Sequence, residues 1–214
     1  MPKKGLIIIN FKDYKQSIGN NAVKLAKQLD NKYVWLIVNS IDLKDVIKSV
    51  KKSKILIEHA DPIELGPFTG SISFPEVKAA KAYGILLNHS EKRIKFQDIK
   101  KGIQLAKKYK LKIVVSSNSI KEAENISKLK PDYVAIEPQE LISGKISISK
   151  ARPELIKNAS KKIRNLLVGA GIHNNMDVKK SIEYGAKGIL VSSSVVTSKN
   201  PKKVLNDLIK GLKQ

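Results

Sequence analysis

Hydrophobic positions along the chain follow two alternating patterns. Eight short runs are apolar almost throughout, and each is followed by a longer segment in which apolar residues recur every three or four positions among lysines. Continuous apolar runs, rather than strict alternation, are typical of strands in a parallel sheet that is covered by helices. The predicted strands are residues 6–10, 33–39, 54–59, 84–89, 112–117, 133–137, 165–171 and 188–193.

The segments between these runs predict amphipathic helices. Pro75, Pro153 and Pro201 stand at three of the expected helix starts, where the missing backbone N–H is harmless. No linker rich in Gly, Ser or Pro divides the chain, so we expect one domain over residues 1–214. The predicted helices are residues 23–30, 43–50, 75–83, 99–110, 120–129, 153–163, 178–185 and 201–213.

Eight β-then-α units in 214 residues predict an α/β fold, a single-domain closed (β/α)₈ barrel. An open doubly wound sheet is the alternative. That fold usually carries a glycine-rich dinucleotide turn after its first strand, whereas the turn here is NFKDYKQSIGN, without GxGxxG. In a closed barrel the active-site residues lie at the C-terminal ends of the strands and in the loops that follow them.

Composition narrows the class of protein. No apolar stretch approaches the roughly 18 residues of a membrane-spanning helix, and there is no cysteine, which excludes disulfides and thiolate chemistry. We therefore expect a cytoplasmic protein. The formal charge of +22 makes nucleic-acid binding the main rival hypothesis, but the lysines are scattered and the chain has only three arginines, Arg93, Arg152 and Arg164. This distribution favours a lysine-rich solvated surface, with nucleic acid bound only weakly and non-specifically.

Chemically active side chains gather at the predicted strand ends. Glu137 leaves a buried strand, where a partly desolvated carboxylate suits proton abstraction, although a structural salt bridge is an alternative. His89 and Glu91 follow the fourth run and could instead begin a helix that Ser90 caps. The strand-end set is Asn10, Lys12, Asn39, His59, Asn88, His89, Ser116 to Asn118, Glu137, Gly169 to Gly171, Ser192 and Ser193.

Small residues close the last two strands. Gly169 to Gly171 close the seventh run, and Ser192 and Ser193 close the eighth. Many barrels bind a phosphate group after these two strands, through exposed backbone N–H groups. Tight turns also require small residues, but two such sites in these strands favour phosphate.

These motifs together resemble the triosephosphate isomerase family. The resemblance rests on NFK after the first strand, NHSEKR after the fourth, an EP-containing loop after the sixth, GAG after the seventh and a serine pair after the eighth. It runs in order from Asn10 to about Val196. The segments EPQELI, ISKARPE and GAGI are particularly similar to the compact archaeal branch of the family.

The resemblance implies an activity and a set of roles. The activity is interconversion of dihydroxyacetone phosphate and glyceraldehyde 3-phosphate through an enediolate, with no metal and no cofactor. Glu137 resembles the catalytic base, His89 the electrophile, Lys12 the cation that offsets negative charge, and Glu91 its acidic helper. The substrate-binding residues that the resemblance implies are Asn10, Lys12, Ile142, Ser143, Gly171, Ser192 and Ser193.

Two further expectations come from the resemblance. Residues from Ile142 onward correspond to the family's lid, but Ser143 replaces a glycine of that lid and Lys145 adds a cation. The segment HADPIELGPFTG, residues 59–70, corresponds to a loop that reaches into a neighbouring subunit, which implies a homodimer or homotetramer. The hypotheses left open are a different phosphate-binding barrel, such as a sugar-phosphate epimerase, and a basic nucleic-acid-binding protein that has lost catalysis.

Overall fold

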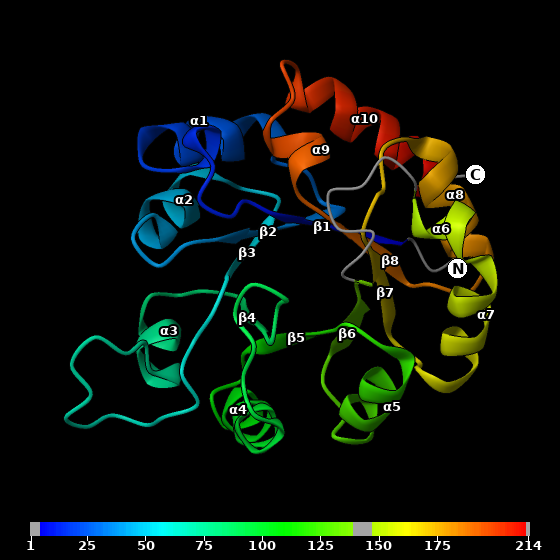
Figure 1. Cartoon of the computed structure of the whole chain (residues 1–214). Coiled ribbons are helices and arrows are strands. Elements are labelled where there is room, and N and C mark those ends of the chain that lie inside the picture. The colour runs from blue at the N-terminus through cyan, green and yellow to red at the C-terminus, as the bar shows by residue number, and fades with distance from the viewer. Residues whose placement is uncertain (1–4, 139–146, 213–214) are drawn as a thin grey trace.

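Eight parallel strands close into a barrel (Figure 1). The computed structural model describes residues 5–138 and 147–212. Each strand pairs with the next along the chain, and β1 pairs with β8 to close the ring. The strands are β1 Leu6–Asn10, β2 Val34–Val38, β3 Lys54–Ile57, β4 Gly84–Leu87, β5 Lys112–Ser117, β6 Tyr133–Ile136, β7 Leu166–Gly169 and β8 Gly188–Val191. All eight predicted strands, and the barrel itself, are therefore confirmed.

Helices lie outside the strand ring (Figure 1). The eight predicted helices are present as α1 Asn20–Leu29, α2 Leu43–Ser49, α3 Phe74–Ala79, α4 Phe96–Lys108, α5 Ile120–Lys128, α7 Pro153–Lys162, α8 Asn175–Glu183 and α10 Pro201–Leu212. Within residues 5–138 and 147–212, three short elements were not predicted: the 3₁₀ helix η1 Lys15–Ser17, α6 Ile148–Ala151 and α9 Ser193–Val196. Each spans about one turn, which is too short for a hydrophobic period to be read from the sequence.

Two apolar layers hold the barrel together. Side chains that point outward from the strands pack against the helices, and those that point inward fill the centre. The inner layer has one residue from each strand: Ile8, Ile37, Leu56, Leu86, Val114, Ala135, Leu167 and Leu190. Because this layer leaves no open channel, the interior is a packed core and any ligand must bind at an end of the barrel.

Aromatic side chains close the N-terminal end. Trp35 meets Tyr83 and Tyr133 edge to face, with ring centroids 5.0 Å and 5.5 Å apart. Leu6 packs against the same inner layer. This end of the barrel is therefore built from apolar contacts.

Glycines begin two strands where neighbouring backbones approach closely. A Cβ at Gly84 would lie 2.3 Å from the carbonyl oxygen of Lys112, and one at Gly188 would lie 2.2 Å from that of Leu6. Any larger residue would push these strands apart, so the two glycines help to set the barrel's circumference.

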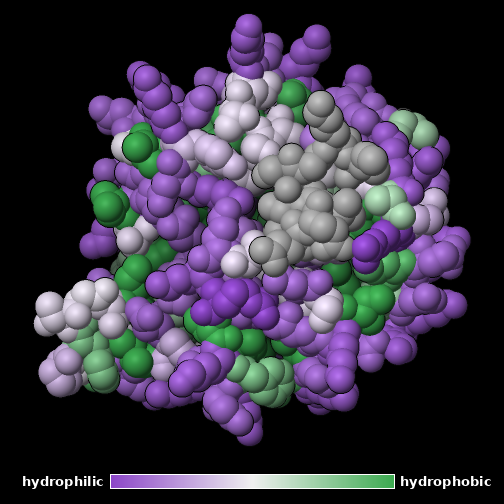
Figure 2. Space-filling view, in the orientation of Figure 1, coloured by the Kyte–Doolittle hydropathy of each residue, from purple (hydrophilic) through white to green (hydrophobic). Residues whose placement is uncertain are grey.

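The surface is strongly hydrophilic on the face seen in Figure 2, in agreement with the lysine-rich composition. The loop between β3 and α3 is different: it projects from the body in Figure 1 and shows hydrophobic and near-neutral colours in Figure 2. None of the described helices is long and apolar enough to cross a membrane.

Candidate active site

Polar residues replace apolar ones where the strands end. Two positions beyond the inner apolar layer, the eight strands carry Asn10, Asn39, Glu58, Asn88, Ser116, Glu137, Gly169 and Ser192. Because side chains in a strand alternate with a period of two, these positions continue the row that faces the interior, except at Asn88, which bonds to Ser116 and Glu122 instead. At this level the C-terminal mouth of the barrel therefore carries polar residues and one glycine.

One pocket at this mouth brings the main predicted residues together. Lys12, His89 and Glu137 line it, together with residues 170–173 and 190–194 at the ends of β7 and β8. The predicted ligands Gly171, Ser192 and Ser193 belong to the second group. Residues that follow β1, β4, β6, β7 and β8 thus converge onto one cavity.

The two groups with acid–base chemistry are close and buried. His89 Nε2 lies 3.7 Å from Glu137 Oε2, and the two residues are only 5% exposed each. Both side chains reach the pocket. A carbonyl compound in this pocket would contact a carboxylate and an imidazole at the same time.

The cation is held in place by a carboxylate. Lys12 Nζ lies 2.6 Å from Glu91 Oε1, and the lysine side chain is mostly buried while that of Glu91 is more than half exposed. Asn10 is buried, and its Oδ1 accepts a hydrogen bond from the backbone N–H of Lys12 at 3.2 Å. The predicted set of Asn10, Lys12 and Glu91 is therefore one connected group.

Hydrogen bonding around His89 indicates its tautomer. The backbone N–H of Glu91 donates to His89 Nδ1 at 3.3 Å, which requires a lone pair on Nδ1. The Glu91 carboxylate is also 3.3 Å from Nδ1, but no hydrogen bond joins them. A neutral imidazole bonded in this way carries its proton on Nε2, the nitrogen nearer Glu137.

The interpretation of Ser90 as a helix cap is wrong. Helix α4 begins at Phe96 with Lys95 as its N-cap, and Ser90 and Glu91 lie in a turn before it. His89 consequently does not start a helix. Its orientation comes from the turn and from the Glu91 N–H instead.

Three residues beside the pocket have left-handed backbone conformations without being glycine. Lys12 has φ of 47°, Asn88 60° and Ala170 75°. Such conformations are uncommon for non-glycine residues and tend to occur where the surrounding structure fixes them for function. The left-handed conformation of Asn88 breaks the strand alternation, so that His89 rather than Asn88 reaches the pocket.

The β7 and β8 loops supply small residues and an unpaired hydroxyl. Ala170 and Gly171 both have positive φ, so the chain turns sharply directly after β7. The buried Ser192 Oγ has no hydrogen-bond partner among the described residues. A buried polar atom of this kind usually has a partner, and in this pocket a bound anion can supply it.

Within residues 5–138 and 147–212, no group of three or more His, Asp or Glu side chains is placed to hold a metal ion. Ile142, Ser143 and Lys145 lie outside the described residues. Their predicted roles therefore remain predictions.

The comparisons with known proteins agree with this geometry. A family model described as Triosephosphate isomerase matches residues 5–211. The chain is 40% identical over 216 residues to the triosephosphate isomerase of Methanothermus fervidus, and the alignment covers 95% of this chain and 97% of that protein. The corresponding enzyme of Saccharolobus solfataricus is 40% identical over 217 residues, with 97% and 96% covered, and that of Archaeoglobus fulgidus is 36% identical over 221 residues, with 98% and 99% covered.

The chain belongs to the triosephosphate isomerase family. The resemblance drawn from the strand-end motifs is thereby confirmed, and the match extends over nearly the whole barrel.

Two residues of the site contact or border Glu137 in a way that the sequence did not predict. Ser116 Oγ donates a hydrogen bond to Glu137 Oε2 at 3.0 Å. On the other side, a Cβ added to Gly169 would lie 2.5 Å from Glu137 Cγ and 2.7 Å from its Oε1, so Gly169 leaves the space that Glu137 occupies. Both stand at strand ends, the one signal that the sequence offered, but only the register of β5, β6 and β7 places them against Glu137.

A third residue, Glu58, was also missed. It lines a second cavity of about 550 Å³, which shares Lys12 and His89 with the first pocket and also contacts Asp13 and Glu91. Burial, together with the negative charges of Asp13 and Glu91, raises the pKa of Glu58 to about 7. The mouth of this family member therefore includes a carboxyl group that titrates near neutral pH.

Proposed function

We propose that this chain interconverts dihydroxyacetone phosphate and glyceraldehyde 3-phosphate through an enediolate, with Glu137 as base and His89 as electrophile. The observation that supports the proposal most strongly is the convergence of Lys12, His89 and Glu137 on one pocket. Membership of the triosephosphate isomerase family supports the substrate.

Each group has its own role in the proposed reaction. Glu137 removes a proton from the carbon next to the substrate carbonyl and returns it to the adjacent carbon. The Nε2–H of His89 donates to the carbonyl oxygen, and Lys12 offsets the charge of the enediolate and the phosphate. A neutral histidine electrophile paired with a glutamate base is the established arrangement in triosephosphate isomerase, which supports these assignments. Moving one proton between neighbouring carbons requires neither a metal nor a redox cofactor.

The phosphate group is proposed to bind at the β7 and β8 loops. Gly171, Ser192 and Ser193 line the same pocket as Glu137, and the unpaired Ser192 Oγ supports an anion there. Asn10 acts through Lys12, and Glu91 holds the same lysine. Ile142 and Ser143 are proposed to complete the phosphate site, with Ser143 supplying a backbone N–H.

Self-association is consistent with the family, and we propose a homodimer or homotetramer. The projecting loop between β3 and α3 exposes Leu65 to 77% and Phe68 to 46%. Its Glu64 carboxylate is tied to α4 by Lys108 Nζ at 2.5 Å and by the Tyr109 hydroxyl. An apolar tip on an anchored base suits insertion into a second copy.

The proposal also covers localisation, domain organisation and nucleic-acid binding. We place the protein in the cytoplasm, as a glycolytic and gluconeogenic enzyme. We treat residues 1–214 as one domain. Binding of nucleic acid is proposed only as a weak, non-specific consequence of the +22 charge.

A coupled assay of glyceraldehyde 3-phosphate conversion by purified wild type and Glu137→Ala tests the function. We expect wild-type turnover, and a loss of roughly 10²–10⁴-fold or more in the variant, because positioned proton transfer contributes that much. Absence of wild-type turnover would reject the isomerase, and turnover of a different sugar phosphate would favour another barrel enzyme. A salt-sensitive RNA gel shift without any triose-phosphate turnover would favour the nucleic-acid hypothesis.

A further inference from the structure

The proposed base is held by a hydroxyl group that the family resemblance did not assign. Ser116 Oγ donates to Glu137 Oε2 at 3.0 Å, with Ser116 1% and Glu137 5% exposed. Resting on the proposed role of Glu137, we propose that Ser116 is a positioning residue that orients this carboxylate before substrate binds.

The register of two neighbouring strands creates the contact. Ser116 is paired with Ala135 across β5 and β6, and Glu137 follows Ala135 by two residues on the same face of β6. Gly169, on β7, leaves room for the Glu137 side chain on its other side. The carboxylate is therefore confined between a hydroxyl donor and a residue without a side chain, which restricts its rotamers.

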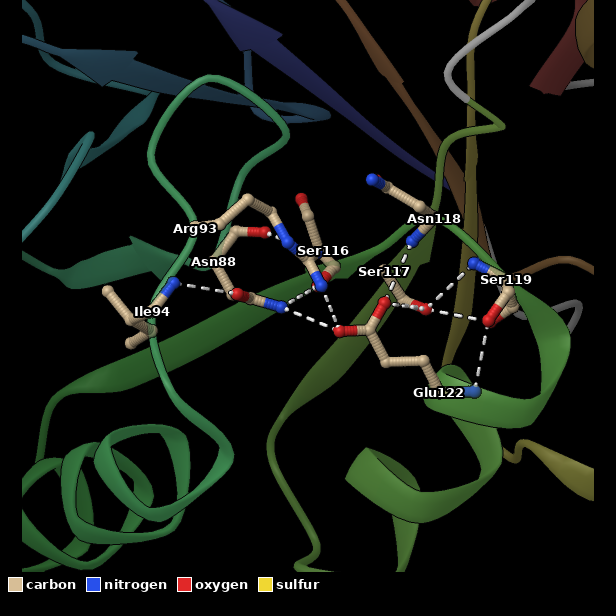
Figure 3. A network of polar contacts seen from close by, with 8 residues as sticks. All are labelled: Asn88, Arg93, Ile94, Ser116, Ser117, Asn118, Ser119 and Glu122. Carbon is tan, nitrogen blue, oxygen red and sulfur yellow. Dashed lines mark hydrogen bonds and ion pairs between the residues drawn. The ribbon is translucent and has the colours of Figure 1, made fainter.

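A polar network fixes Ser116 itself (Figure 3). Asn88 Nδ2 donates to the Ser116 carbonyl oxygen at 2.9 Å and to Glu122 Oε1 at 3.2 Å. Arg93 pairs with the same Glu122 oxygen and also donates to the Asn88 carbonyl oxygen at 3.3 Å. The end of β4 is thus bonded to the end of β5 through the side chains of Asn88, Arg93 and Glu122.

Glu122 is held in its charged form. Its other oxygen, Oε2, accepts from Ser117 Oγ and from the backbone N–H of Asn118, each at 3.1 Å (Figure 3). Burial alone would raise the pKa of Glu122, but the hydrogen bonds and the charge of Arg93 outweigh it and lower the pKa below its usual value. The network therefore stays ionised and intact through the pH range in which an isomerase would be assayed.

This network joins the two proposed catalytic groups. Asn88 directly precedes His89, and the carbonyl that Asn88 holds belongs to the serine that contacts Glu137. A hydrogen bond to a carboxylate favours its ionised form, which is the form that a base must have. Losing the Ser116 hydroxyl should therefore affect the proton-transfer step more than substrate binding.

The test compares Ser116→Ala, Ser116→Thr and a matched control, Ser53→Ala. Ser53 is also a buried serine, 8% exposed, and its hydroxyl donates to the Asn31 carbonyl oxygen at the opposite end of the barrel. The measurements are kcat and KM for triose-phosphate isomerisation. Thermal unfolding of each variant is followed in parallel.

For Ser116→Ala we expect kcat to fall about 10- to 100-fold with KM within about twofold, since a hydrogen bond to a charged group has this magnitude. Ser116→Thr, which keeps a hydroxyl, should recover most of the activity. Ser53→Ala should match wild type in all kinetic measurements.

A folded Ser116→Ala with wild-type kcat overturns the inference, as does an equal loss in Ser53→Ala. Glu137→Gln is measured alongside. If Glu137→Gln is inactive while Ser116→Ala is unaffected, only the role of Ser116 fails. If Glu137→Gln turns over like wild type, the proposed base itself is wrong.

Discussion

The two ends of this barrel are built from the same eight strands but differ in chemistry. At the N-terminal end Trp35, Tyr83 and Tyr133 form edge-to-face pairs over the inner apolar layer. At the C-terminal end the same inward-facing row carries Glu137, Glu58 and other polar residues. One end can therefore be optimised for packing, while the other holds buried polar groups that chemistry requires.

The difference also appears in the backbone. Of the six non-glycine residues with positive φ in the described part of the chain, three lie beside the pocket, and Lys81, Lys110 and Lys130 follow the ends of α3, α4 and α5. Those three close helices in a conformation that glycine usually provides. Left-handed residues at the mouth of the barrel therefore lie beside the pocket, whereas the other three end helices.

The largest stability effect should come from the N-terminal end. Trp35→Ala removes both aromatic contacts, and we expect a loss of about 3 kcal/mol in the free energy of unfolding. The kcat of the folded variant should stay within about twofold of wild type, because the ring lies at the end opposite the pocket. Urea titration and the coupled assay check this, with Ile41→Ala, which is 90% exposed in wild type, as control. A large fall in kcat at unchanged stability would contradict the separation of the two ends.

At Gly169 we expect a substitution to lower kcat. A Cβ there would lie 2.5 Å from Glu137 Cγ, so Gly169→Ala must displace the proposed base. We expect kcat to fall about 10- to 100-fold, since a shift of about 1 Å in a catalytic group can cost that much. Gly102→Ala is the matched control, because its Cβ would lie 2.6 Å from a Leu87 side-chain carbon. Equal kinetic losses in both variants would point to general crowding.

The smallest expected effect is a pH-dependent change in melting temperature when Glu58, at the polar end of the barrel, is replaced. The pKa of Glu58 rises from 4.5 to about 7 on folding, so the folded state loses stability as pH rises through that window. Glu58→Gln removes this loss, and its melting temperature should exceed that of wild type by a few degrees at pH 8, with a smaller gap at pH 5. Glu183→Gln, at an exposed position, controls for the change in net charge. A gap that does not depend on pH would show that Glu58 does not titrate in this range.

Much of this architecture could be predicted from the sequence, because it depends on local pattern. Continuous apolar runs predicted all eight strands, and barrel geometry then directed attention to strand ends, where Lys12, His89 and Glu137 stand. What could not be predicted depends on register and on turns. The contact of Ser116 with Glu137 requires the pairing of β5 with β6, and the place of Ser90 in a turn depends on where α4 begins.

The most direct test of the central claim is solvent-hydrogen incorporation during turnover in ²H₂O. Dihydroxyacetone phosphate is converted by wild type and by Glu137→Ala, and deuterium at C2 of the glyceraldehyde 3-phosphate formed is measured. A proton held on a carboxylate exchanges with solvent, so wild type should introduce deuterium at C2, and Glu137→Ala should slow its appearance by at least about 10²-fold. Deuterium appearing equally fast in both proteins, or absent from product that wild type forms, would contradict the assignment of Glu137 as the base.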